Sequence, residues 1–421
     1  MTSLNFQIEL NAIPTPHRDS IRLSALHVLR VHPPVMVEIE IASGVAAITR
    51  LRPEWKRVAP RADGAAAFEP FFLAFEAAKA AVARGAEPIV AVVYRDGVAS
   101  SLLALRQERL LGARVAVPLL YPLAQYTDVS GQPLSPDELL RLCEALKTTG
   151  TDVLLLRKVR EDSGLFNAIS QHGQSQRAKD LAYYIDLEAH GTFAKYDALF
   201  SARTRRNRRQ RMQKLEQQAG PLSFDVLRGE DAAQAFNTAI EWKRRWLLQR
   251  GTSSPVFDGG AWENILRAAV SAGTVIVTAL KAGGHPVAVE VGLKDRSDYI
   301  AYLGAYDDRF GQYSPGQEQM LRTIEWCFEQ GFRRYDLLAP ADDYKRHWAR
   351  GETHVGIDDY AIALTHIGRG IAELRRHVRP LARDVYHRLS PEVRIAGGRY
   401  GMPAAAAVAA AAAGAVIAAI E

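Results

Sequence analysis

Cysteine is scarce in this sequence. Cys143 and Cys327 are the only two among 421 residues, and their separation fits neither a disulfide framework nor a cysteine metal cluster. The histidines His285 and His347 stand alone, without the spacing of metal ligands. These absences exclude a disulfide-stapled or zinc-stabilised fold, and we expect a protein without metal in a reducing cytoplasm.

The first 40 residues lack a long apolar run. Arg22, His27, Arg30 and His32 interrupt them, so we expect no secretory signal there, and we interpret residues 1–44 as a poorly ordered extension. The other end lacks charge: the segment MPAAAAVAAAAAGAVIAAI just reaches the length of a spanning helix. Alanine contributes almost no insertion energy, so we favour an alanine-rich helical tail over a membrane anchor.

The overall composition is that of a globular protein with a large core. Hydrophobic residues make up 48% of the chain and charged residues 24%. The length suits two domains of ordinary size. A net charge of +6 favours an anionic partner, without saying which one.

The order of the predicted elements indicates an α/β layer fold. In the first half, AAITRLRPEWKRV predicts a strand and a short helix, and the pair Asp96-Gly97 predicts a tight hairpin. Residues 160–180 are polar and form a linker candidate. No titratable cluster before the linker points to catalysis, so we interpret the first domain as structural. The chain is thus divided into an extension, two domains and a tail, at residues 1–44, 45–170, 180–365 and 366–421.

The stretch from Tyr299 to Trp348 carries the clearest functional pattern. It predicts a strand (YIAYLGAY), a loop, a helix and a second strand. Ser314, Pro315 and Gln317 suit the N-cap, N1 and N3 positions of the helix and predict a capping box. Gly316 in the first turn either shapes a tight turn or allows a ligand to approach the backbone. Because helix N-termini favour anions, we expect a phosphate cradle here, although neither G-x-x-x-x-G-K-[ST] nor G-x-G-x-x-G is present in this loop.

Several short motifs in this stretch resemble a known family. The order Ala305-Tyr306-Asp307, Ser314-Pro315-Gly316, Glu329-Gln330-Gly331, Tyr335-Asp336 and Tyr344-Lys345 is similar to the acetyltransferase domain of CelD/BcsL-type proteins. These belong to the GNAT superfamily, are associated with cellulose or exopolysaccharide production, and are similar to Fem-type aminoacyl transferases with two GNAT-like domains. The resemblance implies tandem GNAT-like domains with a mixed, mostly antiparallel central sheet, flanking helices and a helical C-terminal tail.

The resemblance also implies a donor and a place for it. Acetyl-CoA or another acyl-CoA would lie beside the central strand, with its phosphates at the loop. The residues expected to bind it are Tyr302, Gly304, Tyr306, Arg309, Tyr313, Ser314, Pro315 and Gly316.

Three residues are candidates for the proton-transfer chemistry. Glu290 lies in PVAVEVGL on the face that carries small residues, so it either lines a cleft or pairs with a buried arginine. Asp336 follows a strand, where open sheets place ligands, or else it forms an ion pair with Arg333 or Arg334. Tyr344 matches the family motif as a proton donor; its alternative is a solvated helix face.

The remaining candidates concern the acceptor. Lys345 would neutralise a phosphate or carboxylate, or else lie on a solvated helix face. Arg205 and Arg208 belong to an arginine-rich helix that is either a solvated basic face or a clamp for an acidic ligand. Aromatic residues do not interleave with the arginines, so we do not favour nucleic acid. Trp242 is predicted to be core or the wall of a groove.

The resemblance implies an acyl-CoA-dependent N- or O-acyltransferase acting on a small-molecule or sugar-linked acceptor, and the link to polysaccharide or envelope biosynthesis comes from the resemblance alone. Two alternatives stay open: a Fem-like transferase that uses aminoacyl-tRNA, and a non-catalytic scaffold of the polysaccharide machinery. Turnover of acyl-CoA separates the first from the scaffold, and dependence on charged tRNA would identify the Fem-like enzyme.

Overall fold

A long mixed sheet organises the fold. The computed structural model describes residues 36–58, 71–176, 180–251, 254–295, 297–350 and 353–388. Within these residues, fourteen strands form one sheet whose main path runs β1-β2-β3-β4-β6-β14-β8-β13-β12-β11-β10-β9, while β5 pairs with β3 and β7 with β14. The strands are β1 (Val37–Ser43), β2 (Glu87–Arg95), β3 (Val98–Leu110), β4 (Ala113–Pro118), β5 (Ser130–Gly131), β6 (Val153–Arg160), β7 (Gln174–Ser175), β8 (Asp180–Asp186), β9 (Leu222–Leu227), β10 (Ile276–Ala282), β11 (His285–Asp295), β12 (Asp298–Tyr306), β13 (Arg334–Asp336) and β14 (His354–Ala363).

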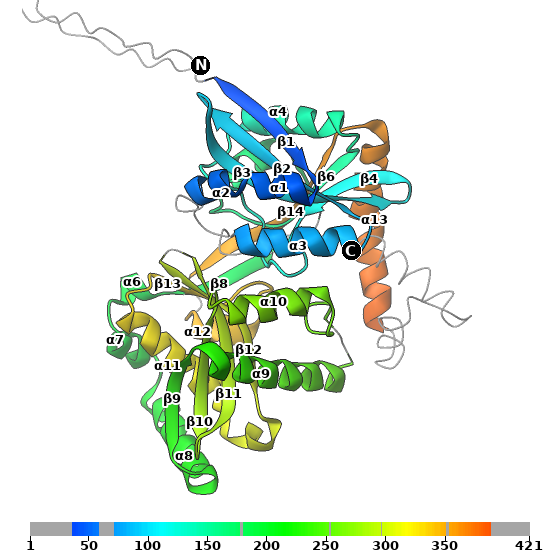
Figure 1. Cartoon of the computed structure of the whole chain (residues 1–421). Helices are drawn as coiled ribbons and strands as arrows, with labels where there is room; N and C mark the ends of the chain where they lie inside the picture. The colour runs from blue at the N-terminus through cyan, green and yellow to red at the C-terminus, as the bar shows by residue number, and fades with distance from the viewer. Residues whose placement is uncertain are drawn as a thin grey trace, which may run out of the picture. The chain divides into compact units, whose positions relative to one another are not determined.

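Helices flank this sheet (Figure 1). They are α1 (Gly44–Arg50), α2 (Arg52–Val58), α3 (Phe71–Ala83), α4 (Pro136–Thr148), α5 (Phe166–His172), α6 (Leu187–His190), α7 (Phe193–Ala198), α8 (Ala202–Ala219), α9 (Gly229–Gln249), α10 (Ala261–Ser271), α11 (Pro315–Glu329), α12 (Asp343–Trp348), α13 (His366–Arg388) and the 3-10 helix η3 (Asp308–Tyr313). Among the pairs of long strands, β4–β6 and β12–β13 are parallel and the others are antiparallel. The predicted fold class, a mostly antiparallel mixed sheet with flanking helices and a helical C-terminal segment, is confirmed.

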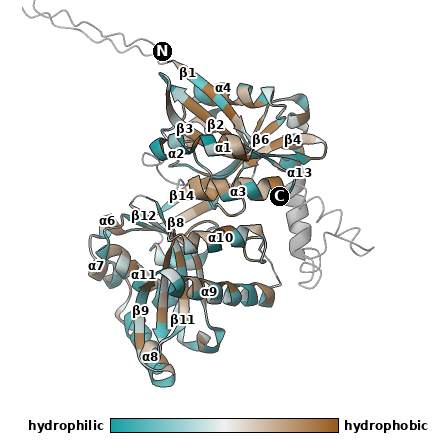
Figure 2. Cartoon of the chain, viewed as in Figure 1, coloured by the Kyte–Doolittle hydropathy of each residue, from teal (hydrophilic) through white to brown (hydrophobic). Residues whose placement is uncertain are grey.

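The core lies on both faces of the second half of the sheet. On one face, Val289 and Leu303 pack with α9 and α10. On the other, Tyr299 packs with Ile324 of α11. Figure 2 shows the strands largely in the hydrophobic colour and the arginine-rich α8 largely in the hydrophilic one. Strands β10 to β12 are therefore sandwiched between α9 and α11.

Turn and helix signals were good guides to these elements. Asp96 and Gly97 both have positive φ, 52° and 74°, and join β2 to β3 as predicted. Gly283 and Gly284 likewise connect β10 to β11. The helix predicted after Ser314 forms as α11, and the other long helices of this part of the sheet include α9 and α10.

Three expectations about local structure were wrong. Residues 37–43 form β1, paired with β2, so the extension predicted for residues 1–44 reaches too far; residues 1–35 and 389–421 lie outside the described residues. AAITRLRPEWKRV forms two helices, α1 and α2, because the strand precedes it. The linker candidate at 160–180 contains helix α5 and strand β7.

Strand β14 occupies an unexpected position. We expected it to end the second domain, but it pairs with β6 over most of its length and with β8 only at its start. A strand from late in the chain therefore continues the sheet of the first half. The division into domains at residues 45–170 and 180–365 stays a prediction.

Candidate active site

A cavity opens where strands β12 and β13 part. These parallel strands pair only over Asp298–Ile300 and Arg334–Asp336. Beyond the paired residues, the cavity is lined by Ala301, Tyr302 and residues 304–306 of β12 and by residues 337–339 after β13, and its volume is about 800 Å³. This volume lies in the range of small-molecule sites, and the cavity lies outside the carboxyl ends of adjacent parallel strands, where open sheets bind ligands.

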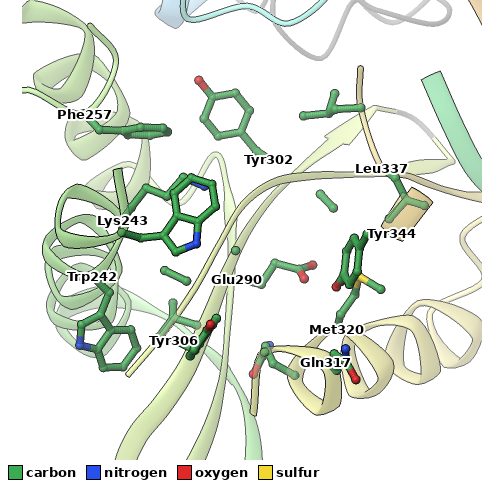
Figure 3. A pocket seen from close by; sticks show the side chains of 18 of the residues that line it. Trp242, Lys243, Phe257, Glu290, Tyr302, Tyr306, Gln317, Met320, Leu337 and Tyr344 are labelled. Atoms are coloured by element: carbon green, nitrogen blue, oxygen red, sulfur yellow. The ribbon is translucent and has the colours of Figure 1, made fainter. Parts of the chain in front are cut away.

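Helices α9, α11 and α12 supply the other walls (Figure 3). The α9 wall is aromatic and cationic, and the α11 wall is polar. Helices α9 and α11 each pack on the sheet through an apolar stripe, and some of the side chains beside that stripe reach the cavity. The principal residues of these walls are Trp242, Lys243, Trp246 and Arg250 from α9, Gly316, Gln317, Gln319 and Met320 from α11, and Tyr344 and Lys345 from α12.

Glu290 lies in the middle of this cavity. Its residue is only 4% exposed, and Figure 3 shows the carboxyl group pointing into the cavity. Tyr335 and Tyr299 donate hydrogen bonds of 2.7 and 2.9 Å to the same oxygen, Oε1. Burial raises the pKa of Glu290 to about 7, while the hydrogen bonds from Tyr335 and Tyr299 act in the opposite direction. No arginine holds this carboxylate among the residues that the structure describes, so of the two expected roles the cleft position applies.

A glycine makes this arrangement sterically feasible. Gly292 lies on the same side of β11 as Glu290, and a Cβ atom there would overlap the ring of Tyr299. The absence of a side chain lets the Tyr299 hydroxyl reach Glu290 across the strand. Gly292, Tyr299 and Tyr335 therefore fix the orientation of the carboxylate.

The first turn of α11 differs from its prediction. Ser314 precedes the helix but has left-handed backbone angles, φ 55° and ψ 52°, and its side chain does not cap the helix. Its hydroxyl instead accepts a hydrogen bond of 2.9 Å from Arg211 of α8, which also reaches Gln317 at 3.4 Å. The predicted capping box was wrong, because αL geometry turns the Ser314 side chain away from the helix N–H groups.

Gly316 faces both the cavity and an aromatic ring. Its N–H has no hydrogen-bond acceptor among the described residues, so a donor remains at the helix start. A Cβ atom at Gly316 would lie 3.1 Å from Cδ1 of Tyr306. The free N–H fits the ligand explanation. The tight-turn explanation has no support, because Gly316 is a residue of helix α11 without positive φ, and the close Tyr306 ring is a second reason for a glycine at this position.

The other residues expected to hold the donor are divided between the cavity and its surroundings. Tyr302, Gly304, Tyr306 and Ser314 line the cavity together with Gly316. The hydroxyl of Tyr302 donates 2.9 Å to the carbonyl of Leu123 in the first half of the chain. The three residues that do not line it are Arg309, Tyr313 and Pro315.

Arg309 and Tyr313 are occupied by other contacts. The Arg309 guanidinium is exposed and paired with Asp307 at 2.5 Å. The hydroxyl of Tyr313 donates to Gln218 of α8. Pro315 is buried at the N1 position of α11. Their predicted contact with the donor has no support in this geometry.

Asp336 does not reach the cavity. It is 4% exposed and accepts hydrogen bonds from Tyr126 at 2.8 Å and from the Leu338 N–H at 2.7 Å. Its second oxygen pairs with Arg160 of β6. The sequence anticipated an ion pair but with the wrong partners, Arg333 or Arg334. Since both oxygens are used, the geometry argues against the catalytic role predicted for Asp336.

Tyr344 and Lys345 do line the cavity. The Tyr344 hydroxyl contacts Met320 Sδ at 3.4 Å. The Tyr344 residue is 44% exposed, but desolvation of its hydroxyl, together with the charge of Glu290, raises the pKa of Tyr344, so the phenol stays protonated. Lys345 Nζ donates 2.9 Å hydrogen bonds to the carbonyls of Leu338 and Pro340, and burial lowers its pKa. Lys345 thus fixes the loop beside the cavity and has a third N–H for a ligand.

Arg205 and Arg208 lie apart from this cavity. Arg208 pairs with Asp197 and its guanidinium lies 5.0 Å from the ring centre of Phe200. Arg205 donates to the carbonyls of Asp197 and Phe200 at 3.2 and 3.1 Å. These arginines connect α8 to α7, and their predicted role in binding the acceptor has no support in this placement. Trp242, in contrast, lines the cavity as the wall residue that its spacing allowed.

Sequence reasoning missed several residues of the site. Tyr299 and Tyr335 look like ordinary core residues of their strands, because nothing local indicates that their hydroxyls meet at Glu290. Lys243 and Arg250 lie three residues before and four residues after Trp246, and could have been found by following helical spacing along α9. Among the described residues, no group of three or more metal-ligating side chains occurs, and no helix combines the length and hydrophobicity needed to cross a bilayer.

Comparison with known proteins agrees with this architecture. Residues 202–346 match the family model described as "Acetyltransferase (GNAT) domain". The crystal structure of FemX is similar, with a TM-score of 0.53 and 11% identity over 72% of this chain and 93% of FemX. At such identity the likeness concerns the fold alone. No curated protein matches the sequence.

Two further solved structures have lower TM-scores. One is a conserved protein of unknown function from Bacteroides thetaiotaomicron, with a TM-score of 0.49 and 11% identity, covering 78% of this chain and all of that one. The other is a tandem GNAT protein from the clavulanic acid biosynthesis pathway, with a TM-score of 0.42 and 11% identity, covering 78% of this chain and 99% of that one. The narrower resemblance to CelD/BcsL-type proteins stays a prediction. Residues 202–346 of this chain therefore match a GNAT acetyltransferase domain.

Proposed function

We propose that this protein is an acyltransferase that moves an acyl group directly from an acyl-CoA to an amine or hydroxyl. The observation that carries the proposal is Glu290, a carboxyl group with a pKa of about 7 that points into a cavity beside the α11 N-terminus. A base with a pKa near the working pH is suited to remove a proton from a nucleophile. The donor supplies an activated thioester, and its CoA thiol leaves as the new amide or ester forms.

The residues of the cavity suit such a donor. The free N–H of Gly316 and the start of α11 favour a phosphate. Tyr302, Gly304 and Tyr306 lie along β12 beside that helix start. Glu290 would hold the proton of the nucleophile at its carboxylate, while Tyr299 and Tyr335 keep one oxygen engaged and the other directed at the cavity.

The acceptor and the pathway are proposed more broadly. We infer a small-molecule or sugar-linked acceptor in polysaccharide or envelope biosynthesis, on the resemblance to CelD/BcsL-type proteins. The test is acyl-CoA turnover with a panel of amines and hydroxyl compounds, measured as release of free CoA thiol. Release that needs both an acceptor and Glu290 supports the proposal. Dependence on aminoacyl-tRNA would favour the Fem-like alternative, and binding without any turnover would favour a scaffold.

A further inference from the structure

The α9 wall carries two cations without a carboxylate partner. Lys243 Nζ lies 4.3 Å and Arg250 Cζ 4.0 Å from the ring centre of Trp246. The contacts with the ring orient both groups but do not neutralise them. Among the described residues, neither Lys243 nor Arg250 forms an ion pair, whereas their neighbour Arg245 pairs with Asp308 at 3.2 Å.

The carboxylates that line the cavity do not pair with Lys243 or Arg250. Its carboxylates are Glu290, Asp308 and Asp342. Asp308 pairs with Arg245, Asp342 accepts the Lys345 backbone N–H at 2.7 Å at the start of α12, and Glu290 is held by two tyrosines. Burial and the nearby charges of Arg250 and Lys345 lower the pKa of Lys243. Cations gathered in this way favour a bound anion.

We propose that Lys243 and Arg250, both held on Trp246, bind an oxyanion of the acceptor, so that the acceptor is a molecule with a phosphate or carboxylate group. This inference rests on the proposed function, because the proposed function assigns the α11 side of the cavity to the acyl-CoA donor. Figure 3 shows Lys243 on the α9 wall and Gln317, next to Gly316, at the α11 wall, with Glu290 between them. The donor phosphates are assigned to the α11 side. The cations on α9 are therefore left for the second substrate, with its nucleophile directed at Glu290.

The test replaces each cation by a neutral side chain of similar length. Lys243→Met and Arg250→Met keep an apolar stem against Trp246. Arg244→Met is the matched control, because it removes the same charge from the same helix, but from an ion pair with Glu263 at a position that does not line the cavity. Inorganic phosphate and acetate are titrated calorimetrically into each folded protein, with and without saturating acetyl-CoA. We expect the preferred anion to bind the wild type with acetyl-CoA present, and its affinity to fall about tenfold or more in Lys243→Met and Arg250→Met, a strongly charge-dependent loss.

The anion affinity of the control variant and the acetyl-CoA affinity of all variants distinguish the possible outcomes. Arg244→Met should retain anion affinity to within about twofold, and the acetyl-CoA affinity should be equal in all four proteins. Preference for phosphate or for acetate identifies the oxyanion class. The inference is overturned if the wild type binds neither anion, if Arg244→Met loses as much affinity, or if the anion competes with acetyl-CoA. Failure of acetyl-CoA to bind at all would instead remove the proposed function, and the titrations without it would still report on the cation pair.

Discussion

At the residue scale, Glu290 combines burial with an unusual hydrogen-bond arrangement. Two tyrosine hydroxyls bind one of its oxygens, which restricts its rotamer without supplying a positive charge. A buried arginine in the same place would have kept the carboxylate ionised and weakly basic. The tyrosines leave its pKa at about 7, where the carboxylate is available as a base and is still strong enough to accept a proton.

Replacement of Glu290 by glutamine should remove the base while preserving shape. We expect Glu290→Gln to lower kcat about 10²- to 10⁴-fold, the usual contribution of a general base. The wild-type rate should rise with pH through about 7 as Glu290 loses its proton, and this rise should be absent in the variant. Steady-state kinetics from pH 5.5 to 9 measure both effects. A wild-type kcat over that range would show that Glu290 is structural.

The same substitution should change the pH dependence of stability. Because burial raises the pKa of Glu290 from its ordinary 4.5 to about 7, the folded state prefers the protonated form. Its stabilising contribution is present below pH 4.5 and is lost as pH rises towards 7, by about 3 kcal/mol from the usual 1.4 kcal/mol per pKa unit. Urea unfolding at pH 5 and pH 8 should reveal a decline in the wild type that Glu290→Gln lacks.

Gly316 can be tested against its neighbour Tyr306. We expect Gly316→Val to weaken acetyl-CoA binding roughly 10- to 100-fold, because loss of a hydrogen bond to a charged phosphate costs about 1.5–3 kcal/mol. The valine must also displace the Tyr306 ring, 3.1 Å from a Cβ at this position. Calorimetry on Gly316→Val with and without Tyr306→Ala separates the causes: rescue by Tyr306→Ala would mean that ring displacement, and not blocked access to the N–H, weakened binding.

At the element scale, α4 and α11 have similar sequences at their starts but different geometries. Ser135 forms a capping box with Glu138 before α4, with both hydrogen bonds present. Ser314 before α11 makes none of these bonds and contacts Arg211 instead. We expect Ser135→Ala to cost about 1 kcal/mol of stability, the usual value of an N-cap.

Ser314→Ala should cost less than Ser135→Ala, because its partner Arg211 can turn to solvent. Thermal melting of the two variants at the same pH gives the comparison. An equal loss in both would indicate that Ser314 caps α11 in solution, and would restore the capping box that the sequence predicted.

Element-level prediction succeeded where the information was local. The turn at Asp96-Gly97 and the helix that begins at Pro315 each depend on a few adjacent residues. The same holds for the site, where only local information could be used. Glu290 was identified because side chains alternate between the two faces of its strand. Tyr335, 45 positions later, could not be identified as its partner, because alternation and periodicity contain no information on which strands become neighbours. Asp336 was misassigned for the same reason, since Arg160 lies 176 positions earlier.

At the scale of the whole molecule, buried polar contacts connect the two halves of the chain. Asp336 of β13 binds Arg160 of β6 and Tyr126, and Tyr302 binds the Leu123 carbonyl. Removing one member of a buried ion pair leaves the other charge unpaired, at a cost of about 3–5 kcal/mol. We therefore expect Asp336→Asn to destabilise the protein strongly in chemical denaturation.

A second substitution keeps this prediction testable if Asp336→Asn fails to fold. Arg160→Met combined with Asp336→Leu removes both charges. Arg160 also pairs with Asp162, which keeps Arg334 as a partner at 3.2 Å, so the double variant should recover part of the lost stability, because apolar replacement of a buried pair is often nearly neutral. The recovered protein should retain acyl-CoA binding, since neither residue lines the cavity. Loss of binding in a stable double variant would return Asp336 to the list of candidates for the active site.

The position of β14 has a consequence for the growing polypeptide on the ribosome. Strand β6 ends at Arg160, and its partner β14 starts at His354. At translation rates of about 5–20 residues per second, the ribosome needs roughly 10–40 s to deliver that partner. During this interval one edge of β6, an apolar strand, has no native neighbour and is open to pairing with other nascent chains. Production of this protein should thus depend on chaperones that shield strand edges, and a chain stalled before His354 should aggregate.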